Sequence, residues 1–444
     1  MIVEQSPLTP VGGKPLLQAP GVPVLMTGGT LVSRQRMAAA AAALATALPD
    51  RPAALNLCES RENFLISFLA LLRRGQTCLL PPSRAPAIVA EVMAEHRDSY
   101  QIDDAWVSAR RGPVAADAHA ELMVPPERVV VVGYTSGSTG WPAPNPKTWG
   151  SFIASTQFNA SRLREVLGAA REECVPWILA TVPSQHMYGL ETSVLLPLLG
   201  GMAVHAAHPL YPADIAAALA ELPSPRVLVT TPVHLRALTQ SGVDLPELAA
   251  VVSATAPLSA DLARTVEERF ATRVLEFFGS TETCVIASRR TAHESAWAPY
   301  PGVVLDSRDE ATRVAAPWLP GEVILQDLLE LRADGRFEVV GRNSDMVEVA
   351  GKRASLADLT RRLLSVPGVT DAVVFQPDAA NDTGVRRLAA LAVANGVDAQ
   401  HVLARLAALV DPVFLPRPLL LVSRLPRNEV GKLPREALQA ALRR

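Results

Sequence analysis

The stretch Val130–Gly140 reads VVVGYTSGSTG. Its β-branched residues predict a strand, and the glycines and hydroxyls that follow predict a loop. Glycine permits unusual backbone angles, so successive N–H groups of such a loop can point at one anion while hydroxyls add donors. The hydroxyls belong to Thr135, Ser136, Ser138 and Thr139. An ordinary flexible loop remains the alternative. The Walker A pattern GxxxxGK[ST] occurs nowhere in the sequence, which disfavours a P-loop NTPase.

Outward from this loop, short apolar segments alternate with amphipathic or alanine-rich stretches along most of the chain. That rhythm predicts parallel sheets covered by helices, because parallel strands need a long, usually helical, crossover between them. The predicted strands are Ala53–Cys58, Thr77–Leu80, Trp177–Val182, Val227–Thr230, Leu248–Ser253 and Val274–Phe278. The predicted helices are Met37–Leu48 and Glu62–Arg73. The predicted fold class is therefore α/β, with a large multi-layer N-terminal domain of mostly parallel sheets flanked by helices.

The composition changes near residue 341. Residues 342–444 contain 15 basic and 10 acidic residues, a net charge of +5, whereas the preceding part carries −7. The rhythm changes as well, with helices predicted over Leu356–Leu364 and Ala399–Leu409 and strands over Val369–Phe375 and Leu388–Val393. We therefore expect two domains, residues 1–341 and a small α+β domain at residues 342–444.

The overall composition excludes several classes of protein. The 444 residues include 42 basic and 44 acidic side chains, and 49% of the residues are hydrophobic. This composition is typical of a globular protein, and the near-neutral balance argues against a nucleic-acid partner. No apolar run reaches the ~18 residues that a bilayer requires, and the first ten residues, MIVEQSPLTP, do not resemble a secretory signal. Four scattered cysteines without metal-site spacing are typical of reduced thiols. We expect a soluble cytoplasmic protein without a membrane span.

Lysine is rare in this chain. Of the 42 basic residues only four are lysines, namely Lys14, Lys147, Lys352 and Lys432. A compact ammonium and a planar guanidinium are not interchangeable, so each lysine is a candidate for a site that arginine does not suit. Lys14, in an arm rich in proline and glycine, is interpreted as an ordinary surface residue.

Five motifs, in order, resemble those of the adenylate-forming superfamily, which comprises acyl- and aryl-CoA synthetases, nonribosomal peptide adenylation domains and luciferases. TSGSTG after an apolar strand is the first, and FGSTE at Phe278–Glu282 is the second. Asp327 ahead of a DGRF segment is the third, and GRNSD at Gly341–Asp345, followed by GKR, is the fourth. The fifth is LPRNEVGKLPR at Leu425–Arg435. Ordered matches over residues 130–435 are very hard to obtain by chance.

This resemblance implies ATP and Mg²⁺ as cofactors. A carboxylate would attack the α-phosphate of ATP, and a thiol would then displace AMP from the acyl-adenylate. Thr281 would contact phosphate and Glu282 would hold Mg²⁺, since hard cations prefer oxygen ligands. Lys432 would bridge the substrate carboxylate and the α-phosphate. With His186, these three are the expected catalytic residues. The expected nucleotide-binding residues are Thr135, Ser136, Gly137, Ser138, Thr139, Gly140, Lys147, Ala254, Thr255, Phe278 (stacking on adenine), Gly279, Asp327 (accepting from the ribose hydroxyls) and Arg342.

The resemblance also implies an acyl pocket and a hinge. His186, ahead of the apolar PLLGG run, matches the histidine of the family near the acyl pocket, although a structural histidine is an equally good interpretation. The expected substrate-binding residues are Tyr188, Gly189 and Ile286, with Ala254, Thr255 and Gly279 at the same pocket. Asp345 matches the hinge about which the small domain rotates between the two half-reactions.

Some positions depart from the family pattern. The usual TGxPK is TGWPA at Thr139–Ala143, and the lysine is delayed to Lys147, so its equivalence to the usual phosphate-loop lysine is open. Glu282, Asp327 and Lys432 are nevertheless present, and we expect an active enzyme. The alternative from another class is a catalytically inactive nucleotide-binding protein with the same fold.

The extended pattern TSGSTGxPxxxxKTWG resembles the short ligases of aryl-polyene and xanthomonadin-type pigment pathways. Those enzymes load a hydroxybenzoate-like aryl acid onto an acyl carrier protein. The net charge of +5 on residues 342–444 would attract an acidic carrier protein, and it would attract the phosphates of coenzyme A equally well. We therefore expect an acid–thiol ligase acting on an aryl acid with a carrier protein as acceptor, and coenzyme A as the alternative acceptor.

Overall fold

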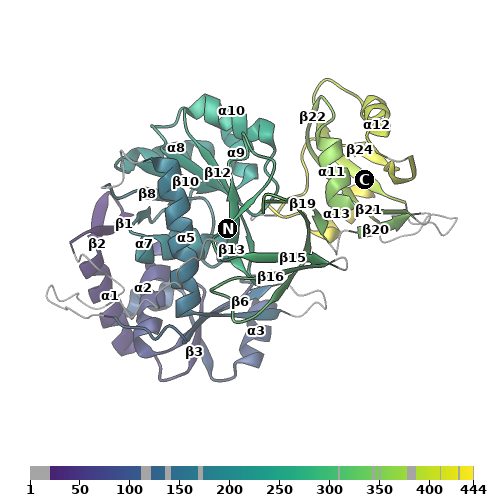
Figure 1. Cartoon of the computed structure of the whole chain (residues 1–444). Helices are drawn as coiled ribbons and strands as arrows, with labels where there is room; N and C mark the ends of the chain where they lie inside the picture. The colour runs from purple at the N-terminus through teal and green to yellow at the C-terminus, as the bar shows by residue number, and fades with distance from the viewer. Residues whose placement is uncertain are drawn as a thin grey trace, which may run out of the picture. The chain divides into compact units, whose positions relative to one another are not determined.

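The computed structural model describes residues 21–111, 122–135, 142–168, 174–308, 311–342, 346–349, 352–377, 387–410, 412–428 and 431–443. The chain divides into two compact units (Figure 1). The first unit comprises Met1–Ser295, Tyr300–Gly302 and Pro317–Pro320, and the second comprises Ala296–Pro299, Val303–Ala316 and Gly321–Arg444. The boundary at residue 341 that the change in charge and rhythm predicts stays a prediction.

The larger sheet of the first unit is mostly parallel. Its strands lie in the order β13-β12-β11-β10-β8-β9-β1-β2, and only the β12–β13 and β1–β2 pairs are antiparallel. The strands are β1 (Pro23–Thr27), β2 (Thr30–Ser33), β8 (Trp177–Ala180), β9 (Ala203–His205), β10 (Arg226–Thr230), β11 (Ala250–Ser253), β12 (Val274–Ser280) and β13 (Cys284–Arg289). Parallel strands bring their carboxyl ends to one edge, where open α/β sheets place their ligands.

Helices cover this sheet, as the alternating sequence pattern predicts. The helical elements are α5 (Trp149–Leu167), α6 (Met187–Leu190), the π-helical turn η2 (Glu191–Leu195), α7 (Leu196–Leu199), α8 (Pro212–Glu221), α9 (Pro232–Gln240) and α10 (Ala260–Phe270). On one face, Leu219 of α8, Leu235 of α9 and Val266 of α10 belong to a single buried cluster with Leu179 and Leu228 of the strands. Burying such side chains is the main stabilising contribution to this layer.

A smaller sheet completes the first unit. Its order is β5-β3-β4-β6-β7, parallel except for the last pair. The elements are α1 (Arg34–Ala47), β3 (Ala53–Asn56), α2 (Arg61–Arg74), β4 (Thr77–Leu80), α3 (Pro86–Glu95), β5 (Ser99–Ile102), α4 (Asp104–Arg110), β6 (Val129–Thr135) and β7 (Ala143–Thr148). The buried helix α2 begins after Ser60, whose hydroxyl accepts from the Asn63 N–H, and it ends at Gly75 in the left-handed conformation. Both are typical helix caps.

The second unit is built from antiparallel hairpins and a small α+β segment. The elements are β14 (Ala298–Pro299), β15 (Val304–Arg308), β16 (Ala311–Ala315), β17 (Val323–Leu325), β18 (Asp327–Leu331), β19 (Phe337–Arg342), β20 (Met346–Val349), β21 (Lys352–Ser355), α11 (Leu356–Leu364), β22 (Val369–Phe375), β23 (Ala389–Ala394), α12 (Ala399–Ala407), the short η4 (Pro412–Phe414), β24 (Leu419–Leu421) and α13 (Arg435–Leu442). Leu359 and Leu363 of α11 pack with Ala372 and Val374 of β22 in its buried cluster.

The structure confirms the predicted fold class and most of the predicted elements. Thr77–Leu80, Leu356–Leu364 and Val369–Phe375 are matched at both ends, and the other predicted strands and helices lie within a few residues of those observed. The antiparallel strands between β15 and β19 were not predicted, because their apolar residues follow no continuous alternation. No helix within the described ranges has the length and apolar character needed to cross a membrane.

Candidate active site

A turn between β12 and β13 carries two of the predicted site residues, Thr281 and Glu282, both of which are partly exposed. The end of β6 lies against this turn. A Cβ atom added to Gly133 would come within 3.2 Å of Thr281 Cγ2 and within 3.2 Å of Met187 Cε. The absence of a side chain at Gly133 therefore allows this close packing. In the first unit, the strand that leads into the predicted phosphate loop, the Thr281–Glu282 turn and the start of α6 meet at one place.

Hydrogen bonds from side chains hold the backbone of this turn. The Ser280 N–H donates to Thr283 Oγ1 (3.1 Å), and the Thr283 hydroxyl donates to the carbonyl oxygen of Cys284 (2.8 Å). The indole Nε1 of Trp318 donates to the carbonyl oxygen of Thr283 (2.9 Å). Cys284 has a φ of 60°, which residues other than glycine rarely adopt. The turn is thus an unusual backbone conformation that buried side chains stabilise.

Steric crowding explains why the FGSTE motif has a glycine at position 279. Gly279 lies at an irregularity in the β12–β13 pairing. A Cβ atom there would come within 2.1 Å of the Cys284 carbonyl oxygen and 2.7 Å of Val285 Cα. Both neighbours are backbone atoms, so no side chain fits at this position. Phe278, the predicted adenine-stacking residue, precedes it and is partly exposed.

The predicted phosphate loop follows β6 directly. Thr135 ends β6 and pairs with Ala143 at the start of β7, so residues 136–142 connect the two strands of an antiparallel hairpin. The loop residues Ser136, Gly137, Ser138, Thr139 and Gly140 lie outside the described residues. Their contact with phosphate stays a prediction.

Lys147 lies inside the protein. It belongs to β7, its exposed fraction is only 5%, and it pairs in register with Val131 of β6. Its Nζ donates to the backbone carbonyl oxygen of Glu282. The ammonium group therefore contacts the Thr281–Glu282 turn through the backbone.

A buried polar network beside the turn was not predicted from the sequence. Glu191 is 1% exposed, and its Oε1 accepts from the N–H of Val285 (3.1 Å) and from Nδ2 of Asn159 (3.3 Å). Tyr300 Oη donates to Asn159 Oδ1 (2.9 Å). Burial raises the pKa of the Glu191 carboxyl to about 7, although these hydrogen bonds and the charge of Lys147 oppose the rise. The available signal was a single acidic residue inside the apolar run Met187–Met202.

Three of the predicted acyl-pocket residues lie in the short helix α6 or directly before it. His186 is the residue before α6 and is partly buried. Tyr188 is buried, and its hydroxyl donates to the carbonyl oxygens of Thr230 (3.2 Å) and Val252 (3.0 Å), near the carboxyl ends of β10 and β11. A Cβ atom on Gly189 would come within 1.9 Å of the Pro183 carbonyl oxygen. The segment before α6 therefore packs directly on the helix backbone.

The other predicted pocket residues lie on β13 and after β11. Ile286 is fully buried in β13. Ala254 is buried just after β11, and Thr255 is exposed with a φ of 77°. A non-glycine residue in this conformation is typical of a strained functional loop.

A buried arginine fixes the loop that leads to α6. Arg61 is 1% exposed and donates to the carbonyl oxygens of Ala180 and Val182, both at 3.1 Å, and of His205, at 2.9 Å. Burial lowers its pKa to about 10. Because its donors satisfy carbonyl groups at the carboxyl ends of β8 and β9, Arg61 ties α2 of the smaller sheet to this edge of the larger sheet.

Two predicted nucleotide residues begin and end a hairpin of the second unit. Asp327 is the first residue of β18 and is 9% exposed. It pairs in register with Arg342, the last residue of β19. Asp345, the predicted hinge residue, lies outside the described residues.

Lys432 lies on a braced loop of the second unit. The side chain is exposed, and the backbone N–H donates to Asn428 Oδ1 (2.8 Å). Arg427 donates to the Gly431 carbonyl oxygen (2.9 Å) and makes two bonds to the Asp371 carboxylate of β22 (2.8 and 3.2 Å). The loop is therefore anchored to the sheet while the lysine side chain faces solvent.

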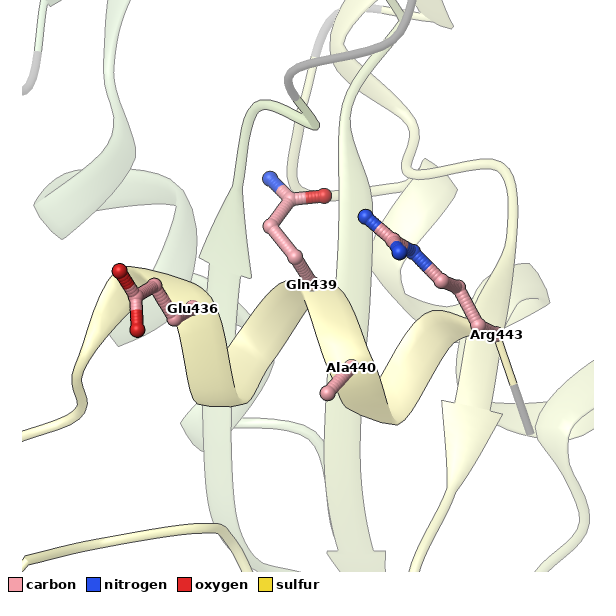
Figure 2. Close-up of a pocket in the computed structure, with 4 residues that line it drawn as sticks. All are labelled: Glu436, Gln439, Ala440 and Arg443. Carbon is pink, nitrogen blue, oxygen red and sulfur yellow. The ribbon is translucent and has the colours of Figure 1, made fainter.

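A surface hollow in the second unit lies apart from these residues within the described part of the chain. It is lined by a single face of α13, with Glu436, Gln439, Ala440 and Arg443 (Figure 2). Within the described ranges, no three or more His, Cys, Asp or Glu side chains are grouped to hold a metal ion. A single carboxylate such as that of Glu282 still fits Mg²⁺, which is usually held by one or two carboxylates together with substrate phosphates.

Comparison with known proteins adds independent findings. Residues 35–327 match the family described as AMP-binding enzyme. The 4-coumarate–CoA ligase of Cereibacter sphaeroides is 29% identical over 322 residues, which cover 71% of this chain and 72% of the relative. The o-succinylbenzoate CoA synthetase of Bacillus subtilis, solved with its acyl-adenylate intermediate, has a TM-score of 0.79 at 19% identity and covers 97% of this chain and 99% of its own. An anthranilate CoA ligase bound to anthranoyl-AMP has a TM-score of 0.79 at 16% identity, over 95% of this chain and 94% of its own.

The fold is that of the adenylate-forming enzymes. The match over residues 35–327 spans well over half of the chain, and the chain therefore belongs to the AMP-binding enzyme family. It is an acid–thiol ligase. The predicted superfamily, fold class and enzyme class are confirmed.

Proposed function

We propose that this ligase joins a hydroxybenzoate-like aryl acid to ATP, releases pyrophosphate, and transfers the acyl group to the phosphopantetheine thiol of an acyl carrier protein. In the first step a carboxylate oxygen bonds to the α-phosphorus as the bond to the bridging oxygen of pyrophosphate breaks. In the second the thiol sulfur bonds to the acyl carbon and AMP leaves. The observation that carries the proposal is the packing of the Thr281–Glu282 turn against the end of β6, the strand that leads into the predicted phosphate loop. A Cβ atom placed on Gly133 of this strand would lie 3.2 Å from Thr281 Cγ2.

In the first unit, the Thr281 hydroxyl would donate to a phosphate oxygen and Glu282 would hold Mg²⁺. When bound, Mg²⁺ neutralises phosphate charge, and phosphoryl transfer depends mainly on such neutralisation and on positioning. Both side chains are partly exposed and therefore accessible to a ligand. The Bacillus subtilis synthetase has also been solved with ATP and a magnesium ion, which supports these two cofactors here.

In the second unit, Lys432 would bring its ammonium group to the reacting carboxylate and α-phosphate. Its exposure and the anchoring of its loop through Arg427 support this role. Asp327 would accept hydrogen bonds from the ribose hydroxyls. A small domain of residues 342–444 that turns about Asp345 would present Lys432 in the first half-reaction only.

The proposed acid is aromatic. 4-Coumarate, anthranilate and o-succinylbenzoate, in the names of the similar proteins, all carry an aryl ring. Tyr188 donates its hydroxyl to backbone carbonyls and Ile286 is apolar and buried, so both would offer an aryl ring an apolar contact surface. His186, at the start of α6, would border this pocket.

The experiment for adenylation is acid-dependent pyrophosphate release with ATP and Mg²⁺ across hydroxybenzoates, cinnamates and fatty acids, with hydroxylamine added to trap the adenylate. A response to one aryl acid supports the proposal, and Lys432→Ala should then abolish most of it. ATP binding without pyrophosphate release or hydroxamate for any acid would favour an inactive nucleotide-binding protein.

The acceptor is tested separately. Arg361 and Arg387 are exposed within residues 342–444, whose net charge is +5, and Arg362 is left intact because it donates to the Leu409 carbonyl oxygen. Charge reversal of Arg361 and Arg387 to glutamate should slow transfer to an acidic carrier at low salt, and replacement by lysine should not. The CoA ligases among the relatives favour coenzyme A as the second candidate. Faster transfer to free coenzyme A than to carrier would favour it.

A further inference from the structure

The Thr281–Glu282 turn depends on groups outside its own strands. The Trp318 indole satisfies the carbonyl of Thr283, Lys147 satisfies the carbonyl of Glu282, and Glu191 satisfies the N–H of Val285. Buried backbone groups need such partners, because an unsatisfied donor or acceptor costs about 1–3 kcal/mol. Two of the three partners, Lys147 and Glu191, are ionisable side chains.

Lys147 is an unusual residue for a strand interior. The chain has 38 arginines and only four lysines, yet this buried position, 5% exposed, holds a lysine. Removing an ammonium from water costs several kcal/mol unless it is compensated. Its bond to the Glu282 carbonyl oxygen supplies part of that compensation, and the ionised form of Glu191 interacts favourably with the ammonium group.

Glu191 acts on the other end of the same turn. Its Oε1 accepts from Val285, three residues after the carbonyl that Lys147 holds. Asn159 donates to the same Oε1 and is itself bonded to Tyr300, so the carboxyl group cannot shift without breaking this chain of bonds. All four side chains in the network are 5% exposed or less. The backbone at Glu282 is therefore held by a cation, and the backbone at Val285 by a carboxyl group.

The geometry points to Lys147 and Glu191 as paired positioning residues, which hold the Thr281–Glu282 turn in the conformation that receives phosphate and Mg²⁺. This inference rests on the proposed function of that turn. It gives Lys147 a role different from direct contact with phosphate, since its Nζ is already used on the Glu282 carbonyl oxygen. Misplacing a reacting group by about 1 Å can cost on the order of a hundredfold in rate, so such positioning has a measurable effect.

The test compares disruptive and conservative variants of the intact enzyme. Lys147→Met removes the donor, and Glu191→Ala removes the acceptor of the Val285 N–H, whereas Glu191→Gln keeps that acceptor. Arg34→Met is the matched control, because Arg34 is a buried cation that donates to the carbonyl oxygens of Pro197 and Leu198 and not to the turn. Three quantities are measured: amide exchange of residues 280–286 without ligand, kcat and KM for ATP in pyrophosphate release, and calorimetric binding of ATP with and without Mg²⁺.

We expect Lys147→Met and Glu191→Ala to lower kcat by about tenfold or more and to speed exchange of the Val285 amide. In both variants, adding Mg²⁺ should increase the affinity for ATP less than it does in the wild type. Glu191→Gln should stay within about threefold of the wild type, and Arg34→Met should lower the melting temperature but leave kcat and exchange of the turn unchanged. The double variant Lys147→Met with Glu191→Ala should be little worse than the worse single variant, because both act on one turn.

Two results would overturn the inference. A Lys147→Met enzyme with a raised KM for ATP but unchanged kcat and unchanged exchange would make Lys147 a phosphate ligand. If Glu191→Ala changes neither kcat nor amide exchange of the turn, Glu191 is not a positioning residue and the paired role is refuted. This variant tests the inference even if Lys147→Met does not fold. A wild-type chain that releases no pyrophosphate with any acid would refute the proposed function alone, because amide exchange still reports whether the pair holds the turn.

Discussion

Replacing Gly189 by alanine perturbs the predicted acyl pocket at a point where the structure allows the effect to be worked out. The new Cβ atom would lie 1.9 Å from the Pro183 carbonyl oxygen and 2.8 Å from its carbonyl carbon. Ordinary contacts begin near 3.4 Å, so the two backbone segments must separate by roughly 1.5 Å. The displaced carbonyl also accepts from the N–H of His186 (3.3 Å), so the predicted pocket histidine would move with it.

The expected magnitude follows from this displacement. Overpacking a well-packed site costs about 1–3 kcal/mol in the free energy of unfolding, and a backbone-on-backbone clash belongs at the upper end. A shift of more than about 1 Å next to a substrate is expected to lower kcat/KM by on the order of a hundredfold. Gly189→Ala should therefore lose both stability and activity, with activity the more sensitive.

The assay is thermal melting together with acid-dependent pyrophosphate release. Gly321→Ala is the control, because a Cβ atom there meets no atom within 4 Å and its φ is not in the left-handed region. That control should match the wild type in both measurements. A Gly189→Ala enzyme with the wild-type melting temperature and kcat/KM would refute the argument, since it would mean that the segment at Pro183 is not held against α6.

Three further predictions follow from the same structure. Gly279→Ala forces a Cβ atom to within 2.1 Å of the Cys284 carbonyl oxygen, so pyrophosphate release should fall by on the order of a hundredfold, as a steady-state assay would show. Arg427→Met breaks the two bonds to Asp371, which should cost about 1.5–3 kcal/mol in the unfolding free energy of the second unit and speed amide exchange around residues 427–432, measured by melting and mass spectrometry. The pKa of Glu191 is about 7 in the folded chain and 4.5 in the unfolded chain, so the folded chain binds more protons between these two pH values. The stability of the wild-type protein relative to the Glu191→Gln variant should therefore fall as the pH rises from 4.5 to about 7, and level off above it. Equal profiles of melting temperature against pH for the two proteins would contradict this prediction.

Much of the fold was predictable because its elements are encoded locally. Apolar strands alternating with amphipathic helices identified the parallel sheets, and Thr77–Leu80 and Leu356–Leu364 were located at both ends. The predicted strand Val274–Phe278 stops short of the observed end of β12 at Ser280, because polar residues continue the pairing beyond the apolar run. The hairpins from β15 to β19 were missed because their pairing depends on neighbouring strands and not on a periodic apolar pattern.

Only those residues of the candidate site that belong to a sequence motif could be predicted. Glu282, Asp327 and Lys432 were identified from motif order, and their roles stay predictions. Sequence reasoning missed Glu191 and Asn159 because neither belongs to one of the motifs, and only the folded chain shows which groups they bond. The partner of Glu191 is the backbone of Val285, 94 residues away.

The sequence by itself determined the α/β class, the family, and the residue types available for phosphate chemistry, because strand and helix periodicity and contiguous motifs are properties of neighbouring residues. Tertiary structure alone decided where Lys147 acts. The residue stands seven positions after the TSGSTG motif, yet its ammonium contacts the carbonyl of Glu282, 135 residues further along the chain. The physical reason is that a buried charge takes its role from the groups that folding brings around it, and packing, not sequence proximity, selects those groups.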